Sequence, residues 1–159
     1  MPPLTIRKLD FNDKQEINRV KDKIQELIKN KESYYALKVD NKATFKTLFR
    51  NPPEEDGWYI ILNDESSLYT GNTKDLNNRI NKQTDAFHSN DREINNKRNF
   101  IKKFIGKGIF EKPYICVISR KDLCTKLGLR TMPDFDRGNI EKVIDIFRGQ
   151  LEFIHFDDI

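Results

Sequence analysis

The chain has 159 residues and a mass of 18.9 kDa, with 36% hydrophobic and 34% charged side chains and a formal net charge of +4. It carries 11 Phe, 5 Tyr and 1 Trp, which argues against wholesale disorder and supplies apolar material for one core. No apolar run approaches the roughly 18 residues that a membrane helix needs, and no signal peptide is visible. We therefore expect a globular protein of the cytoplasm or, in a eukaryote, of the nucleus.

The few cysteines and histidines limit the metal chemistry that the chain can support. Cys116 and Cys124 do not make a disulfide framework, and neither has a Cys or His neighbour at zinc-finger spacing. His88 and His155 are too few for a histidine-rich metal cage. Any metal would have to rest on carboxylates and water, which are the ligands typical of Mg²⁺ and Mn²⁺.

The first 53 residues predict a helical arm with one short strand. Asp13 can cap a helix, and the apolar residues that follow it recur at helical spacing. These residues are Ile17, Val20, Ile24, Leu27 and Ile28. A strand is predicted at 34–39 and a short helix at 43–49. The Pro- and Glu-rich cluster at 51–57 is a breaker, so we divide the chain into residues 1–53 and 54–159.

The remainder of the chain alternates short strands and helices. Strands are predicted at 58–62, 67–70 and 113–119, and helices at 72–80, 91–105, 121–127 and 140–151. Asn72 or Thr73 can cap the first of these helices and Asn139 the last, while Gly128 ends the third. The pattern predicts an α/β (α+β) fold in which a small antiparallel or mixed sheet of about three strands is flanked by helices.

A short stretch after the breaker combines glycines, tyrosines and an arginine at tight spacing. Its fixed positions, in chain order, are Gly57, Tyr59, Tyr69, Gly71, Thr73, Leu76 and Arg79. The pattern resembles the GIY-YIG nuclease family, in which a G-x-Y strand and a Y-x-G strand precede a helix of pattern x-T-x-x-L-x-x-R. Trp58 and Thr70 stand where that family has isoleucine, and both are compatible with a strand.

The residue types in this stretch favour phosphodiester chemistry. Alternation along paired strands can place Tyr59 and Tyr69 on one side of the sheet. Gly71 is expected to end the second strand, and Arg79 to reach back from the next helix and hold a phosphate bidentately. A cross-strand aromatic pair beside a surface arginine is the structural alternative.

The resemblance implies a role for each of these side chains. Tyr59 would activate or orient the attacking water, and Tyr69 would hydrogen-bond the phosphate or that water. Arg79 would stabilise the charge that develops on the phosphate. In the family, one glutamate on a later helix is the sole protein ligand of a divalent metal, which here would be Mg²⁺ or Mn²⁺.

Glu141, near the start of the last predicted helix, is our candidate for this metal ligand. Glu152, near the end of the same helix pattern, is the alternative, whereas Glu111 falls on the wrong element. The chain also departs from the family pattern. Many family members have a His or Lys one turn after the arginine, and here Lys82 stands near that position. Many also have an Asn about a dozen residues after the glutamate, but no Asn follows Glu141, and His155 is the only polar ring in that region.

The basic excess of the chain lies in its middle third. Residues 73–107 carry nine basic and four acidic side chains. Such a segment suits phosphate contacts, which give affinity without sequence choice, although a solvated helix face would look the same. The candidates for nucleic-acid binding are Lys74, Lys82, Arg92, Lys97, Arg98, Lys102 and Lys103.

Together these observations predict a stand-alone, metal-dependent endonuclease that hydrolyses double-stranded DNA and has no membrane partner. Restriction is one candidate role, and a homodimer is left open. The alternative is a catalytically silent module on the same scaffold that binds nucleic acid or a protein. In a third reading, the amphipathic helix at 17–28 binds a partner.

Overall fold

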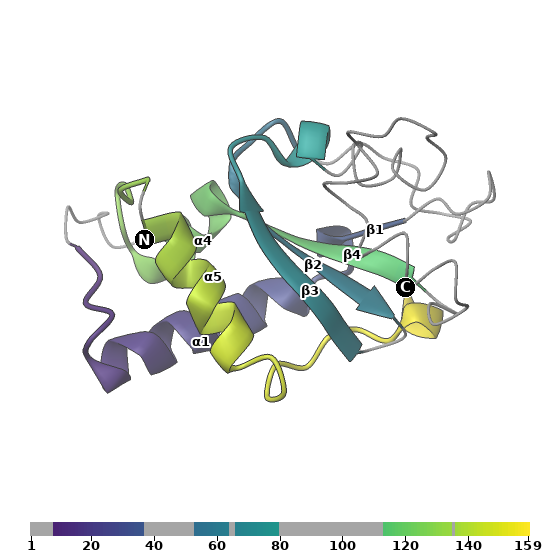
Figure 1. The fold of residues 1–159 in the computed structure, drawn as a ribbon, viewed down its shortest axis with the longest axis horizontal. Coiled ribbons are helices and arrows are strands. Elements are labelled where there is room, and N and C mark those ends of the chain that lie inside the picture. The colour runs from purple at the N-terminus through teal and green to yellow at the C-terminus, as the bar shows by residue number, and fades with distance from the viewer. Residues whose placement is uncertain (1–7, 37–52, 64–65, 80–112, 135) are drawn as a thin grey trace, which may run out of the picture.

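The computed structural model describes residues 8–36, 53–63, 66–79, 113–134 and 136–159 (Figure 1). Its helical elements are α1 (Lys14–Ile28), η1 (Lys31–Ser33), α4 (Arg120–Leu127), α5 (Asp136–Ile146) and η2 (Phe156–Asp158). Its strands are β1 (Tyr34–Ala36), β2 (Gly57–Asn63), β3 (Ser66–Thr73) and β4 (Pro113–Ser119). A further helix begins at Leu76 and is described as far as Arg79. The helices predicted at 43–49 and 91–105 lie outside the described residues.

The described strands form one antiparallel sheet in the order β1-β4-β2-β3. This arrangement confirms the predicted α+β class. The sheet gains a strand over the prediction because β1, which the sequence places in the arm, pairs with β4 with Tyr34 opposite Cys116. β3 therefore forms one edge of the sheet and β1 the other (Figure 1).

One face of the sheet carries the hydrophobic core. Trp58, Ile60 and Leu62 alternate along β2 and are fully buried on this face. Helices α1, α4 and α5 pack there: α1 contacts β4, α4 contacts β2 and β4, and α5 contacts β2 and β3. Val20 and Ile24 of α1 belong to the same core. The N-terminal helix is thus built into the sheet's core, while the predicted division after residue 53 stays a prediction.

Local signals set the ends of two predicted helices. The Asp13 carboxylate accepts a hydrogen bond from the Gln15 N–H at 2.9 Å and caps α1. Ser119 caps α4 in the same way, accepting from the Asp122 N–H at 3.1 Å. Gly128 ends α4 in the left-handed conformation, with φ of 71°, as its predicted role as a stop requires.

The last helix differs from the prediction at both ends. It begins at Asp136, so Asn139, the predicted cap, lies inside the first turn. The Asn139 side-chain amide donates there to the Asp136 carboxylate at 3.1 Å. It ends at Ile146, so Leu151 is buried from a segment without regular secondary structure. The apolar pattern continues past the end of the helix because the irregular segment that follows also contributes Leu151 and Phe153 to the core.

The sequence predicts no membrane-spanning helix, and the helices of the structure can be compared with this prediction. Among the described residues, no helix combines the length and the apolar composition that crossing a bilayer requires. The cellular location stays a prediction.

Candidate active site

The site begins where β2 and β3 approach each other closely. Tyr59 of β2 lies opposite Gly71 of β3 and is fully buried. A Cβ at Gly71 would come within 2.4 Å of both the Cζ and the hydroxyl oxygen of Tyr59. The missing side chain therefore makes the space that the phenol occupies.

This contact corrects the predicted role of Gly71. The strand does not end there but continues to Thr73. Gly128 is also the only glycine with a positive φ among the described residues. Gly71 is thus required for space beside a neighbouring ring and not for a turn.

Gly57 has a comparable role on the other side of β2. Its Cβ would lie 2.2 Å from the carbonyl oxygen of Ile118 in β4. The absence of a side chain lets β2 begin against the end of β4, with Gly57 opposite Ser119. The two motif glycines therefore permit close backbone and ring contacts on both sides of the strand that carries Tyr59.

Two phenols and a guanidinium meet beside this strand pair. The Tyr59 and Tyr69 ring centroids are 6.1 Å apart, with 36° between the ring planes. The Arg79 Nε donates a hydrogen bond to the Tyr59 hydroxyl oxygen over 3.2 Å. The predicted convergence of the three side chains is present. Arg79 is bonded to one ring of the aromatic pair, whereas the structural alternative expected an arginine on the surface beside it.

The helix that carries Arg79 has a different cap from the predicted Asn72 or Thr73. The Asp75 carboxylate accepts from the Asn78 N–H at 3.1 Å, which is the geometry of an N-cap. The Thr73 hydroxyl accepts from the Asp75 N–H at 3.2 Å and so orients the capping residue. The motif threonine is therefore not the cap itself but binds the backbone of Asp75, the residue that caps the helix.

The segment before β2 also holds the first turn of this helix. The Leu76 N–H donates to the Glu55 carbonyl at 2.8 Å, and the Asn77 N–H donates to the Pro53 carbonyl at 3.1 Å. Helix N-termini leave such N–H groups without helical partners, so a neighbouring backbone that accepts from them fixes the helix. Leu76 is fully buried. The path of the chain from β3 to Arg79 is thereby determined.

The electrostatics of the cluster keep the phenol neutral and the arginine charged. Burial raises the pKa of Tyr69, and the neighbouring Tyr59 raises it further, while Arg79 has a smaller lowering effect. For Arg79, burial works against the charge, but hydrogen bonding to Tyr59 and the proximity of both phenols raise its pKa overall. At neutral pH, Tyr69 is therefore a hydrogen-bond donor and Arg79 a cation.

The structure brings Glu141, and not Glu152, to the cluster. Glu141 is half-buried in α5, close enough for its charge to raise the pKa of Tyr69. Burial raises the pKa of the Glu141 carboxyl, hydrogen bonding from Asn72 opposes this shift, and Asp145 adds to it. Glu152 lies beyond α5 and is exposed, and its backbone N–H donates to the Gln25 side chain at 2.8 Å.

The donor set around Glu141 fits a hydrated divalent ion. Within the described ranges, no three His, Cys, Asp or Glu side chains come together. A single half-buried carboxylate leaves the other coordination positions to water, which suits Mg²⁺ because this ion gives up water reluctantly. The cysteines offer no alternative chemistry, since burial raises the pKa of both the Cys116 and Cys124 thiols.

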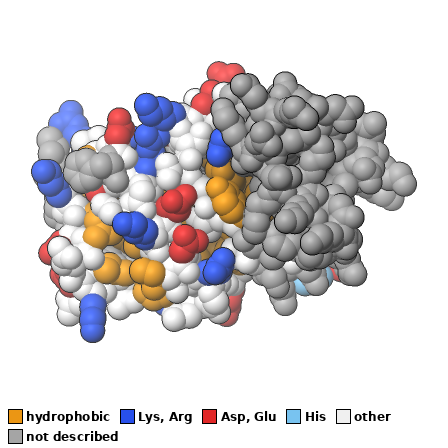
Figure 2. Space-filling view, in the orientation of Figure 1, with side chains coloured by type: hydrophobic (Ala, Val, Ile, Leu, Met, Phe, Trp, Pro, Cys, Tyr) orange, Lys and Arg blue, Asp and Glu red, His pale blue; other side chains and the backbone are white. Residues whose placement is uncertain are grey.

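Lys74 alone of the predicted nucleic-acid-binding residues is described. It is exposed, just before the helix that carries Arg79. In the coloured part of Figure 2, which shows the described residues, basic and acidic side chains are interspersed. The other candidates lie outside the described residues; they are Lys82, Arg92, Lys97, Arg98, Lys102 and Lys103.

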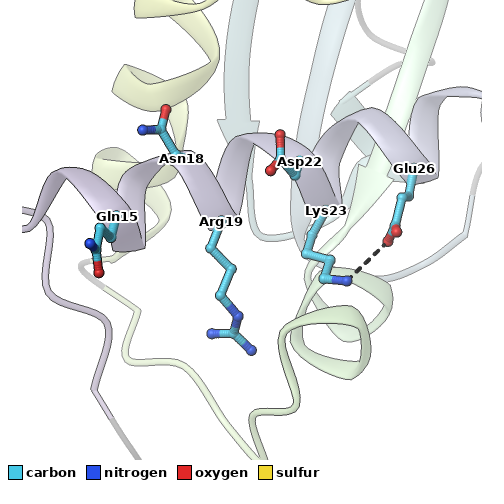
Figure 3. A pocket seen from close by; sticks show the side chains of 6 residues that line it. All are labelled: Gln15, Asn18, Arg19, Asp22, Lys23 and Glu26. Atoms are coloured by element: carbon cyan, nitrogen blue, oxygen red, sulfur yellow. Dashed lines mark ion pairs between the residues drawn. The ribbon is translucent and has the colours of Figure 1, made fainter.

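A hollow along α1 is not a second candidate site (Figure 3). Its side chains all come from one helix, and Lys23 pairs with Glu26 at 3.4 Å. Arg19 also lines it and donates a hydrogen bond to the Leu127 carbonyl of α4. Paired charges along a helix are typical of a solvated face that stabilises packing.

Sequence reasoning missed Arg120, which joins three segments next to the site. Its guanidinium contacts the Asp56 carboxylate at 2.8 Å and the Asp134 carboxylate at 2.7 Å, and it donates to the Met132 carbonyl. Asp56 precedes Gly57, so this contact holds the start of β2 against α4. No local pattern relates residues 56, 120 and 134, and the contact is visible only in the fold.

An antiparallel sheet that presents two tyrosines and an arginine, with a glutamate on a flanking helix, defines a nuclease-type domain. Residues 56–128 match the family model described as GIY-YIG catalytic domain, and this match supports membership of the GIY-YIG nuclease family. No curated protein and no solved structure matches the chain. The family match implies an endonuclease that acts on nucleic acid, and such nucleases generally use divalent metals. Glu141 lies beyond the matched residues.

We expect Gly71→Ala to disturb the site through crowding. The added methyl must displace the Tyr59 ring, so the free energy of unfolding should fall by about 1–3 kcal/mol and cleavage should be largely lost. Gly149→Ala is the matched control, because nothing lies within 4 Å of a Cβ there. Urea unfolding and a cleavage assay on both variants test this, and equal behaviour of the two would show that the Tyr59–Gly71 contact is not tight.

Proposed function

We propose that the chain is a divalent-metal-dependent endodeoxyribonuclease that hydrolyses phosphodiester bonds in double-stranded DNA. The observation that supports this most is the hydrogen bond from Arg79 to the Tyr59 hydroxyl at 3.2 Å, with Tyr69 beside it, inside the segment that matches the family. The half-buried Glu141 carboxylate approaches the same cluster from α5.

The proposal gives each phenol a separate task. Tyr59 is held by the Gly71 contact and by Arg79, so its hydroxyl has one orientation in which to direct the attacking water. Tyr69 is a neutral phenol and donates a hydrogen bond to the phosphate or to that water. Arg79 contributes a fixed positive charge where negative charge develops on the phosphate.

Glu141 would hold the metal ion, with Mg²⁺ or Mn²⁺ fitting a single carboxylate. When bound, the ion supplies positive charge near the leaving oxygen. The surroundings of Glu141 favour this use, since Asn72 donates hydrogen bonds that stabilise its ionised form in a half-buried position.

Binding to the phosphates of a nucleic acid is supported by the basic segment that follows the motif. Residues 73–107 carry the excess of basic side chains, beginning with the exposed Lys74. Contacts from Lys and Arg to phosphates release counterions, so binding should weaken steeply with salt. A plasmid-nicking assay with Mg²⁺, with Mn²⁺ and with chelator tests the activity, and single-stranded DNA and RNA test the substrate. Binding without cleavage would favour the catalytically silent module.

Tyr59→Phe should lower the cleavage rate by on the order of 10²-fold or more while the fold and DNA affinity stay nearly unchanged. Only a hydroxyl is lost, and the ring still fills the space over Gly71. Tyr114→Phe removes a hydroxyl that donates to the Ile154 carbonyl, away from the site, and serves as control. Cleavage by Tyr59→Phe at the control's rate would remove Tyr59 from the mechanism.

Arg79→Lys should lose most of the activity although the positive charge is kept. A lysine ammonium cannot reproduce the planar guanidinium that donates to Tyr59 and a phosphate oxygen together, so we expect a loss of on the order of 10²-fold in kcat. Arg148→Lys is the matched control, because Arg148 is exposed. Rates under single-turnover conditions compare the two, and full activity of Arg79→Lys would reduce the role of Arg79 to charge alone.

Glu141→Gln and Glu152→Gln form a matched pair that tests the metal ligand. Glu141→Gln keeps the shape of the side chain and removes the charge, so it should fold, bind DNA and fail to cleave at ordinary Mg²⁺ concentrations. Glu152→Gln should be nearly silent, because Glu152 is exposed beyond α5. The measurement is the cleavage rate as a function of Mg²⁺ concentration, and the reverse pattern would assign the metal to Glu152.

A further inference from the structure

We propose that Trp58 and Asn72 are positioning residues that fix the Glu141 carboxylate beside the tyrosine–arginine cluster, Trp58 through the backbone of α5 and Asn72 by direct hydrogen bonding. The inference rests on the proposed function, because it concerns how the chain holds its candidate metal ligand. Trp58 replaces the isoleucine of the family motif, and the motif assigns nothing to Asn72.

Trp58 attaches α5 to the sheet. The indole is fully buried on the core face of β2, and its Nε1 donates to the Arg137 carbonyl at 2.8 Å. Arg137 lies in the first turn of α5. A buried indole N–H needs an acceptor, and this bond satisfies it while fixing the start of α5 over β2. An isoleucine could fill the space but could not make the bond.

Fixing Arg137 also fixes the position of Glu141, because both residues lie on the same helix. Glu141 follows Arg137 by four residues and so lies on the same side of α5, about 6 Å further along the axis. Asn72 is the partner of Trp58 on β3, about 5 Å away across the sheet. The distance from Arg137 to Glu141 along α5 is therefore close to the distance between β2 and β3. This agrees with the contacts that α5 makes with both strands.

Asn72 completes the arrangement from the edge of the sheet. Asn72 lies opposite Trp58 on β3, the strand that α5 contacts, and hydrogen bonding from its side chain and its backbone lowers the pKa of Glu141. Among the described strands β3 is an edge strand, and none of them pairs with the backbone groups on its outer side. Asn72 on β3 and the Trp58–Arg137 bond on β2 therefore hold α5, and with it the Glu141 carboxylate, from two neighbouring strands.

The test compares Trp58→Phe and Asn72→Ala with Tyr114→Phe in the full chain. Trp58→Phe keeps a flat ring in the core and removes the donor, and Asn72→Ala removes the side-chain donor on a half-buried edge residue. Tyr114→Phe also removes one donor from a fully buried ring on the core face, but its acceptor is Ile154 and not α5. The control therefore measures the general cost of losing such a bond.

We expect both test variants to lower kcat by about 10-fold or more, with KM for DNA changed by less than about twofold. Binding of Mn²⁺ alone, followed by electron paramagnetic resonance without DNA, should weaken by about 10-fold in both. Tyr114→Phe should change neither quantity. Trp58 is the only tryptophan, so its single indole N–H signal in an NMR spectrum should be slow to exchange in the wild type and in Asn72→Ala.

The outcomes separate positioning from a structural role and from failure of the proposed function. Values of kcat and Mn²⁺ affinity equal to those of the control would overturn the proposal. Should Trp58→Phe fail to fold, Asn72→Ala decides the question. If the wild type binds Mn²⁺ through Glu141 but cleaves no DNA, the proposed function fails and the Mn²⁺ affinities still test positioning. Mn²⁺ binding that does not depend on Glu141 would overturn the positioning proposal itself.

Discussion

The Tyr59 ring against Gly71 is the contact on which the candidate site depends. It forms because two paired strands place a phenol opposite a residue without a side chain, and any Cβ there would lie 2.4 Å from the ring. The hydroxyl is thereby held where the Arg79 Nε reaches it at 3.2 Å. A site built on paired strands and a capped helix is held more firmly than one built on loops.

Alternation along β2 gives adjacent residues two different tasks. Trp58 faces the core and bonds the first turn of α5, whereas Tyr59 faces the opposite side and joins Tyr69 and Arg79. The helix that carries Glu141 and the cluster that Glu141 approaches are thus set by neighbouring positions of one strand. A shift of register by one residue would exchange the two faces and remove both arrangements at once.

The elements that sequence reasoning found are those encoded locally. The residues from Gly57 to Arg79 lie on a hairpin and the helix after it, so spacing alone relates them, and the caps at Asp13 and Gly128 are local as well. The contacts that it missed join distant residues: Trp58 and Arg137 are 79 positions apart, and Asp56 and Arg120 are 64 apart. The addition of β1 to the sheet and the early start of α5 likewise depend on tertiary partners.

The two arginines near the sheet show how partners decide what a cation can do. Arg120 is held by the Asp56 and Asp134 carboxylates, which cancel its charge, so it joins segments of the fold. Arg79 instead donates to the Tyr59 hydroxyl and lies beside Tyr69, a second phenol. A hydroxyl acceptor fixes the direction of the guanidinium, and no carboxylate among the described residues forms an ion pair with it. Half-burial strengthens the attraction of its charge for an anion. Arg79 is therefore suited to hold a phosphate, and Arg120 is not.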